Sequence, residues 1–291
     1  MTDFHAVPGF TASSFNNSTL IVPAVSLGNV PQLTSDLLIK SLGLKRVGYV
    51  GDGSTVAPFA GRGEDGEVVT GGLEVYGHEG GELFVIQQRS PTLKTSKDEH
   101  VALLSGFIRS AEYAFSSVLI LTSLDAASQD DAQLLTPHQR IIPPARSNSS
   151  AGFSSPIPIL QRLEQNLPPL RLNIEPSRFG SSGQPGQSPS TSTPGALYPP
   201  FLPAAGLTRR LLASLDSTEM GQLQAPPHGA VTAWCVEGDN RGDAISLTQL
   251  VLSLLGIEND VQLKEPTSWQ GLFGTTQGWS GGMGQDSELY G

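Results

Sequence analysis

The sequence predicts an α/β layered fold in which a mostly parallel central sheet is flanked by helices. Short apolar segments alternate with longer amphipathic ones along residues 19–124 and again along 207–256. Strands and helices that alternate in this way usually pack as layers around a parallel sheet. Residues 117–124 (SVLILTSL) are almost wholly apolar, which is typical of a parallel strand covered on both faces.

The first strand–helix–strand unit begins with a buried strand at residues 19–25 (TLIVPAV). Gly28 and Asn29 follow, and we expect them to form a turn and the N-cap of a helix, with Gln32 completing a capping box. Gly43 is placed to end that helix. The next strand is expected at residues 45–50, directly after it.

The remaining elements follow from the same patterns. A turn at residues 237–240 contains Gly238, and either Asp239 or Asn240 is expected to cap the helix that Gly256 ends. Further strands are predicted at 72–76, 82–89, 117–124 and 230–236, and further helices at 97–115 and 207–215.

Composition divides the chain into one domain and a tail. Residues 1–265 are predicted to form a single α/β domain, interrupted by an insertion at 143–203 that is rich in Ser, Pro and Gly. We expect this insertion to be unstructured, because it has few apolar residues to bury. Residues 266–291 are predicted to be a flexible, Gly-rich C-terminal tail.

Charge and composition exclude several classes of function. The formal net charge of −10 disfavours nucleic acids and anionic membranes as partners. No apolar run reaches the roughly 18 residues of a membrane span, and the start of the chain does not resemble a signal peptide. The single cysteine, Cys235, lies in a predicted buried strand. These features predict a cytoplasmic protein, with the nucleus as a second compartment.

Motifs that resemble enzyme signatures occur in unsuitable contexts. The G-x-G-x-x-G match at residues 61–66 is followed by a predicted strand, whereas a dinucleotide site needs a helix there. The G-x-S-x-G match at 278–282 has Gly-rich flanks instead of a strand and a helix. The five histidines, including His100, are scattered without zinc-site spacing and are expected to be solvated. The sequence thus predicts no catalytic residue, cofactor or metal.

One enzymatic alternative remains open at the start of the first helix. Backbone N–H groups after Gly28 and Asn29 could bind the phosphate of a nucleotide, or the chain could bind a nucleoside there. However, no basic residue follows until Lys40. A structural role of Gly28 as a turn and Asn29 as a cap is the favoured interpretation.

Three segments resemble a known family. They are VPAVSLGNV at residues 22–30 with DLLI at 36–39, DAQL at 131–134, and EGDN at 237–240 followed by Asp243 and Ala244. This pattern resembles the proteasome assembly chaperone 2 family over roughly residues 18–142 and 205–256. The long insertion is similar to that of fungal members.

The resemblance implies a function in complex assembly and no catalysis. Members of this family form a heterodimer with a related protein, proteasome assembly chaperone 1. The heterodimer binds the outer face of the α-ring of the 20S core particle, promotes correct ring assembly and blocks early binding of the regulatory cap. The expected partners are therefore assembly chaperone 1 and the proteasome α-subunits.

The chain ends in Leu289, Tyr290 and Gly291. Fungal members of the family, like the regulatory ATPases, can end in the same hydrophobic-Tyr-any motif. Composition alone would produce this ending with a chance of roughly 0.7%. A terminal carboxylate can pair with a lysine, and a tyrosine ring can fill an apolar slot. The three residues are therefore predicted to be a docking tag for a pocket in the α-ring.

Overall fold

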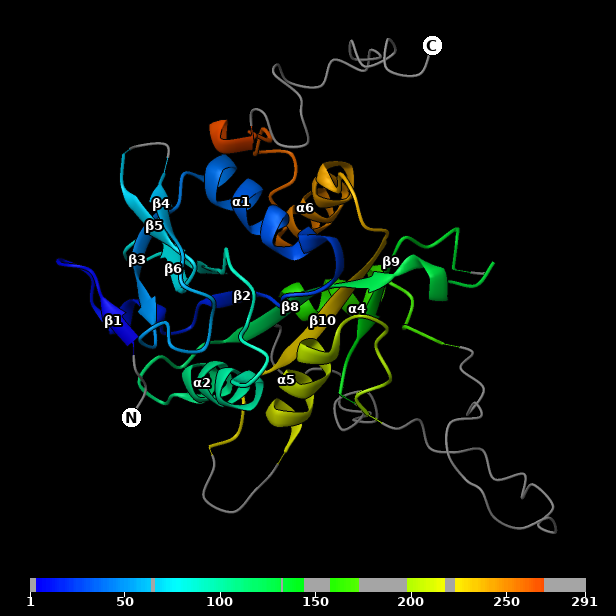
Figure 1. Cartoon of the computed structure of the whole chain (residues 1–291), viewed down its shortest axis with the longest axis horizontal. Helices are drawn as coiled ribbons and strands as arrows, with labels where there is room; N and C mark the ends of the chain where they lie inside the picture. The colour runs from blue at the N-terminus through cyan, green and yellow to red at the C-terminus, as the bar shows by residue number, and fades with distance from the viewer. Residues whose placement is uncertain are drawn as a thin grey trace.

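The computed structural model describes residues 4–63, 66–131, 133–143, 158–172, 198–217 and 223–269. Strands of the main sheet are β1 Phe4–Ala6, β2 Thr19–Pro23, β3 Lys45–Val50, β6 Leu73–Gly77, β7 Leu83–Gln87, β8 Ser117–Asp125, β9 His138–Ile141 and β10 His228–Cys235. Within the described residues they form one sheet in the order β1-β3-β6-β7-β2-β8-β10-β9 (Figure 1).

The centre of this sheet is parallel and its margins are antiparallel. The strands β7, β2, β8 and β10 run parallel to one another. At one margin β1, β3 and β6 pair antiparallel, with β6 joining β7, and at the other margin β9 pairs antiparallel with β10. The predicted α/β layered fold is confirmed, and its parallel pairing is concentrated in the four central strands.

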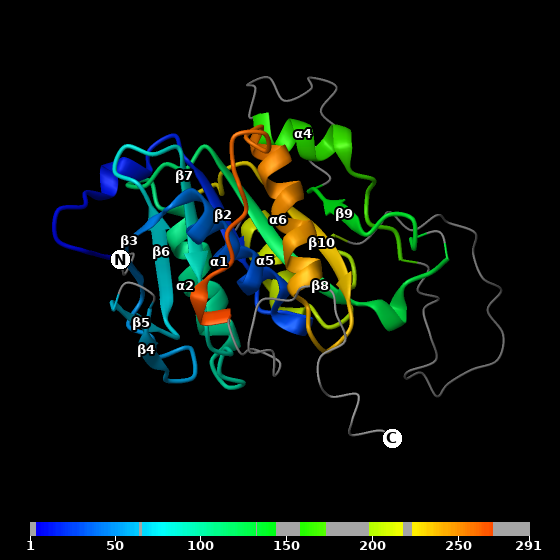
Figure 2. The same ribbon diagram turned by 90° about the horizontal axis from the view of Figure 1, so that it is seen from above.

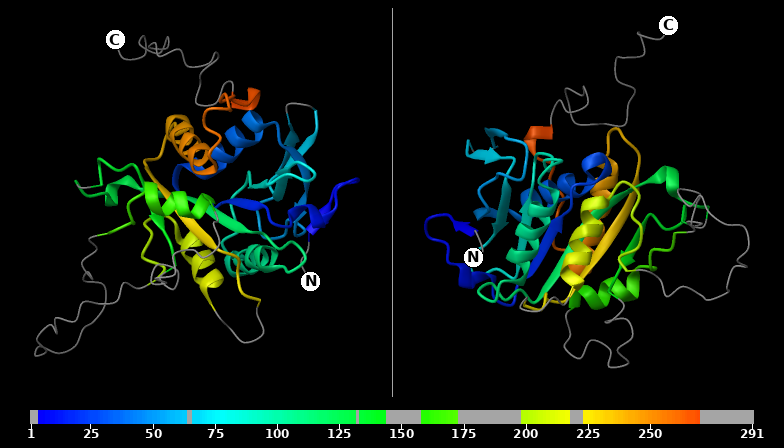
Figure 3. Two further views of the ribbon diagram at one scale, coloured as in Figure 1. Left: turned by 180° about the vertical axis from the view of Figure 1, so that it is seen from behind. Right: turned by 60° about the horizontal axis from the view of Figure 1, so that its bottom comes forward.

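Helices cover both faces of the sheet. One face carries α1 (Val30–Leu42), α6 (Arg241–Leu255) and α4 (Pro158–Asn166), and the other carries α2 (Lys97–Arg109) and α5 (Gly206–Asp216). Figure 2 shows α1 and α6 lying over the central strands, and the right-hand view of Figure 3 shows α2 and α5 side by side on the opposite face.

The apolar run of β8 is divided between two cores. Val118 and Ile120 pack on the side of α2 and α5, whereas Leu119 and Leu121 pack on the side of α1 and α6. All four side chains are fully buried, as alternation of side chains along a strand between two covered faces requires. This arrangement explains why the segment has no polar face.

Both glycines expected to end helices do so. Gly43 after α1 and Gly256 after α6 adopt left-handed backbone conformations, with φ of 64° and 77°, which glycine tolerates best. The predicted helix at 97–115 is shorter than expected and ends at Arg109. Beyond it, the rings of Tyr113 and Phe115 turn into an aromatic cluster around Phe15.

The expectation of an unstructured insertion at 143–203 is wrong for residues 158–172 and for 198–203, where Leu202 is buried in the core. Helix α4 lies within the first of these ranges, and its side chains Ile159, Leu160 and Leu163 are at most 3% exposed. They pack against α6 and the sheet, and the left-hand view of Figure 3 shows helix α4 beside α6. Their spacing gives a short apolar helix face, which the Ser, Pro and Gly content of the whole segment concealed.

The G-x-G-x-x-G match has no dinucleotide-binding context. Its first residues belong to β4 (Ala60–Arg62), which pairs antiparallel with β5 (Val68–Thr70) as a separate hairpin. The backbone N–H of Gly63 donates to the carbonyl of Glu67 at 2.7 Å. The motif thus leads into a hairpin and not into a helix. The second match, at 278–282, lies outside the described residues.

Candidate functional site

Two turns that are far apart in the sequence meet at one edge of the sheet. The turn at Gly28 follows β2 and the turn at Asn240 follows β10, and parallel strands bring their carboxyl ends to the same edge. Gly28 has a φ of 66°, and a Cβ atom placed on it would lie 2.5 Å from Nδ2 of Asn240 and 3.2 Å from Sγ of Cys235. Only glycine fits between these groups.

Hydrogen bonds hold the first turn against the sheet. The carbonyl of Leu27 accepts from the hydroxyl of Ser123 on β8 and, at 3.3 Å, from the thiol of Cys235 on β10. The hydroxyl groups of Ser26 and Ser123 lie 2.8 Å apart. The turn that starts α1 is therefore positioned by the ends of two strands, and this junction places α1 directly beside α6.

The predicted capping interactions of α1 are not formed. Asn29 occupies the N-cap position, but its backbone is left-handed with a φ of 53° and its side chain makes no capping bond. The side chain of Gln32 has no hydrogen-bond partner among the described residues, so there is no capping box. Instead, the carbonyl of Gln32 accepts from Nε2 of Gln87 at 2.9 Å. Contacts with the sheet thus replace the local cap.

Asp239 caps the start of α6, and Asn240 does not. Oδ1 of Asp239 accepts from the backbone N–H of Arg241 at 3.1 Å and from its Nε at 2.9 Å, and these bonds hold the pKa of Asp239 below its usual value. The side chain of Asn240 instead donates to the carbonyl of Gly238 at 3.0 Å. This contact turns it toward Gly28.

The junction is poorly suited to nucleophilic or phosphate chemistry. Burial raises the pKa of the Cys235 thiol to about 11, and the nearby carboxylates of Asp243 and Asp125 add to the rise. The thiol is therefore protonated at neutral pH. The same two carboxylates oppose the binding of an anion beside Gly28. The alternative of a nucleotide site at Gly28 and Asn29 gains no support from this geometry.

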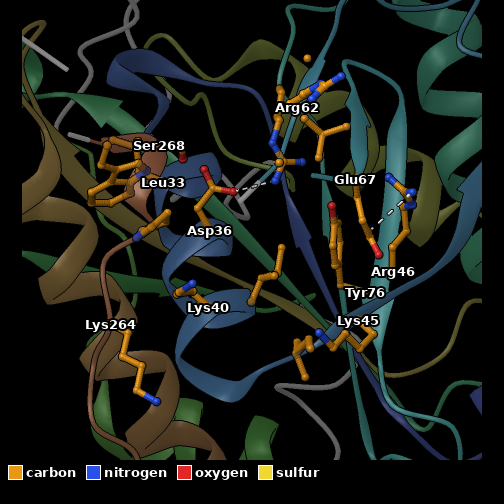
Figure 4. A pocket seen from close by; sticks show the side chains of 18 of the residues that line it. Leu33, Asp36, Lys40, Lys45, Arg46, Arg62, Glu67, Tyr76, Lys264 and Ser268 are labelled. Carbon is orange, nitrogen blue, oxygen red and sulfur yellow. Dashed lines mark hydrogen bonds and ion pairs between the residues drawn. The ribbon is translucent and has the colours of Figure 1, made fainter. Parts of the chain in front are cut away.

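A second feature, which the sequence did not indicate, is a cavity of about 570 Å³ between α1, β3, the β4–β5 hairpin and residues 264–269 (Figure 4). We call it the basic pocket, because six of its lining residues are cationic. They are Lys40, Lys45, Arg46, Arg62, Arg89 and Lys264. Among the described residues, the acidic members of the lining are Asp36 and Glu67. No local motif could have revealed it, since it is assembled from distant segments.

A buried carboxylate organises one wall of the basic pocket. Glu74 is fully buried and accepts from Arg46 at 3.2 Å, from Arg89 at 2.8 Å and from the hydroxyl of Tyr76 at 3.0 Å. Burial raises the pKa of Tyr76, which keeps its hydroxyl neutral and able to donate. Arg89 also pairs with Asp36 at 3.0 Å. These bonds hold two guanidinium groups in place at the cavity wall.

A third feature is an exposed apolar patch beside the edge strand β9. Leu134, Leu135 and Val236 are 64%, 88% and 63% exposed, and we call them the apolar patch. Asp130 and the buried Gln133 exchange two 3.0 Å hydrogen bonds between their side chains and backbone N–H groups. The loop before the leucines is thereby fixed, so the leucines are held outward by a defined structure.

The predicted docking tag, Leu289, Tyr290 and Gly291, lies outside the described residues. The last described residue, Trp269, is 3% exposed and packs with Leu37 of α1 and Ala244 of α6. The expectation of a flexible tail at 266–291 is therefore wrong for its first residues, because the turn Thr267–Trp269 is anchored on the helix pair. Within the described ranges, no cluster of three potential metal ligands is found and no helix is long and apolar enough to cross a membrane.

The fold is similar to that of a solved archaeal homolog of proteasome-assembly chaperone. A crystal structure of PbaA from Pyrococcus furiosus, so described, matches with a TM-score of 0.53 and 14% identity, covering 87% of this chain and 82% of that one. A second crystal structure of PbaA gives a TM-score of 0.52 and 13% identity, covering 100% of this chain and 93% of that one. At such identities the likeness concerns the fold alone.

Sequence comparison identifies the family. Residues 20–184 match the model of the PAC2 family. The chain is 31% identical over 278 residues to proteasome assembly chaperone 2 of Danio rerio, covering 92% of this chain and 95% of that one. It is 33% identical over 270 residues to the same protein of Xenopus tropicalis, covering 88% and 92%. The chain therefore belongs to the PAC2 family of proteasome assembly chaperones. The resemblance to fungal members stays a prediction.

Proposed function

We propose that this chain works without catalysis, as one half of a heterodimeric assembly chaperone that binds the α-ring of the 20S core particle. The observation that carries the proposal is the junction at Gly28 and Asn240. These residues belong to the segments that carry the family resemblance, and their contacts position α1 against α6. The thiol beside them is protonated and flanked by carboxylates, so the geometry favours a scaffold over a reaction centre.

The apolar patch is the surface that we propose for the related chaperone, assembly chaperone 1. Large exposed apolar side chains that gather at one place mark interaction surfaces. Two of the three segments that resemble the family, DAQL at 131–134 and EGDN at 237–240, border or include this patch. A second α/β protein could cover it and extend the apolar contact.

The proposed role of the C-terminal tripeptide is to enter a pocket between α-subunits. The carboxylate of Gly291 would pair with a lysine there, and the ring of Tyr290 would fill an apolar slot. Capture of a C-terminal carboxylate is a recurrent mode of peptide recognition. Because the regulatory ATPases carry the same kind of ending, an occupied pocket would also delay the regulatory cap.

A binding assay with purified core particle and both chaperones tests this function. Deletion of Leu289, Tyr290 and Gly291 is expected to weaken binding at least tenfold, while the melting temperature of the chaperone stays the same. A second variant appends one alanine after Gly291. It keeps every side chain but displaces the carboxylate, so it should weaken binding as well. Equal affinity of the full and truncated complexes would contradict the tag. A rise in melting temperature with added nucleotide would instead favour the enzymatic alternative.

A further inference from the structure

We propose that the basic pocket binds the acidic, aromatic C-terminal tail of the same chain and so holds the docking tag on the domain. This inference rests on the proposed function of residues 289–291 as a tag. The basic pocket would then compete with the α-ring pocket for the tag, and the tag would have to leave the basic pocket before it could bind the α-ring.

Charge is the first argument. The chain has 27 acidic and 17 basic residues, yet six of the basic ones line this single cavity. Among the described residues they face Asp36 and Glu67 in the lining and Glu74 beneath it, so within this described part positive charge is in excess. Residues 270–291 contain Asp286, Glu288 and the terminal carboxylate, and no Lys, Arg or His. The tail and the pocket are therefore complementary in charge.

Two of the cations are well placed to meet a ligand. Arg62 on β4 and Lys264, in the segment that leads to the tail, are both exposed and stand on opposite sides of the cavity. Figure 4 shows the side chain of Asp36 between them and that of Tyr76 to one side, near Glu67. A carboxylate bound here could reach a cation from either side, and such charge-assisted contacts are stronger than neutral ones.

The cavity also offers apolar surface for an aromatic ring. Phe59 is 49% exposed at its rim, and Leu33, Tyr76 and Trp269 contribute further apolar lining. The volume of about 570 Å³ is within the range of pockets that bind small ligands, and it can accommodate a tyrosine side chain with the adjoining terminal carboxylate. The tripeptide at 289–291 presents apolar side chains next to a carboxylate, and the cavity offers apolar surface next to cations.

Attachment makes this contact favourable even if it is weak. Trp269 lines the pocket and is itself buried, so the tail starts at the wall of its proposed site. A flexible chain of this length has an end-to-end distance on the order of 25 Å, which allows its tip to return. Tethering on this scale gives an effective concentration of about 1 mM. Ordering of the Gly-rich segment costs part of the gain, so the contact should open readily.

Accessibility of the C-terminus in the full-length chain tests the proposal. A carboxypeptidase is added, and the release of Gly291 and Tyr290 is followed by mass spectrometry. We expect release to be about tenfold faster in the double variant Arg62→Glu and Lys264→Glu than in the unchanged chain. High salt should accelerate release from the unchanged chain, because screening weakens the attraction.

A matched control carries the same change in net charge away from the pocket. Lys94→Glu with Arg171→Glu replaces two exposed cations that do not line the cavity, and it should leave the release rate unaltered. Circular dichroism checks that each variant is folded. Equal rates in the unchanged chain and the pocket variant would overturn the proposal. So would protection that depends on protein concentration, since it would indicate the tail of a second copy.

The two proposals can fail separately. If the pocket variant exposes the tail while deletion of residues 289–291 leaves binding to the core particle unchanged, the tag function fails and the intramolecular contact stands. If the deletion abolishes binding but the release rates are equal, the tag stands and the contact fails. If both hold, the pocket variant should also bind the core particle more tightly than the control variant does.

Discussion

At the scale of single residues, Gly28 is constrained both by its backbone conformation and by its surroundings. Its backbone is left-handed, and the side chains of Asn240 and Cys235 occupy the space that a Cβ atom would need. The left-handed backbone and the lack of space for a Cβ atom coincide at this one residue, because the turn that starts α1 is also where the start of α6 packs against α1. Conformation and packing therefore select glycine independently.

Substitution Gly28→Ala is predicted to lower the free energy of unfolding by about 2–4 kcal/mol, which combines left-handed strain with overpacking. Gly80→Ala is the matched control, since Gly80 has a similar φ of 69° but open space around its Cβ position. The control should lose only about 1 kcal/mol. Urea denaturation of both variants measures the two losses. Equal losses would mean that the contact with Asn240 relaxes without cost.

At the scale of the elements, α2 shows how a helix end can bury a titratable group. His100 lies in its first turn, is 3% exposed, and has its Nδ1 atom 3.0 Å from the hydroxyl of Thr55. The expectation that His100 is solvated is therefore wrong. The loop that contains Thr55 folds over the start of α2, and a histidine in sequence gives no sign of such a cover. Burial lowers the pKa of His100 to about 4.

Acid is predicted to destabilise the fold through His100. In the unfolded chain this histidine titrates near pH 6.5, whereas in the folded chain it stays neutral down to about pH 4. As the pH falls, the unfolded state binds a proton before the folded state does. The contribution of neutral His100 to stability is therefore complete above pH 6.5 and is lost as the pH falls below it. The free energy of unfolding should drop by about 2 kcal/mol between pH 7 and pH 5 from this group.

The variant His100→Gln, which can still accept from Thr55, isolates this effect. Its free energy of unfolding should depend less steeply on pH than that of the unchanged chain, as measured by urea denaturation at pH 7 and pH 5. Burial also lowers the pKa of His138, so some dependence will persist in the variant. The same slope in both proteins would show that His100 does not contribute.

At the scale of the whole molecule, the apolar patch and the basic pocket lie toward opposite margins of the sheet. The patch adjoins β9 at one edge, and the pocket lies beside β3 and β6 near the other. Figure 1 shows these strands at opposite ends of the molecule. A partner on the patch would therefore leave the pocket accessible, and the two proposed contacts can operate at the same time.

The double variant Leu135→Glu and Val236→Glu is predicted to weaken the complex with the related chaperone at least tenfold, because two charges would enter an apolar contact. Phe201→Glu with Leu223→Glu is the matched control, since these residues are 55% and 57% exposed outside the patch. Titration of the purified partner gives both dissociation constants, and melting temperatures report on folding. If both double variants bind equally well, the partner docks elsewhere.

The sequence by itself determined much of the local structure of this protein. Several elements were predicted in nearly the observed places. They include the strand at 117–124, the first residues of the helices after the turns at 27–29 and 237–240, and the last residues of those helices before Gly43 and Gly256. These features depend on side-chain periodicity and on backbone conformations that few residues tolerate. Both act over a few neighbouring residues, so a sequence displays them directly. The family resemblance rested on the same short segments.

Only the tertiary structure decided how these elements meet. Several features depend on contacts between residues that are distant in the chain. They are the order of the strands, the packing of helix α4 within the insertion, the contact of Gly28 with Asn240 and the burial of Glu74. So does the basic pocket, which no motif marks. Such neighbours are selected by packing, burial and charge satisfaction in three dimensions. A pattern that repeats along the chain can predict a buried face, but it does not identify the side chain that will cover it.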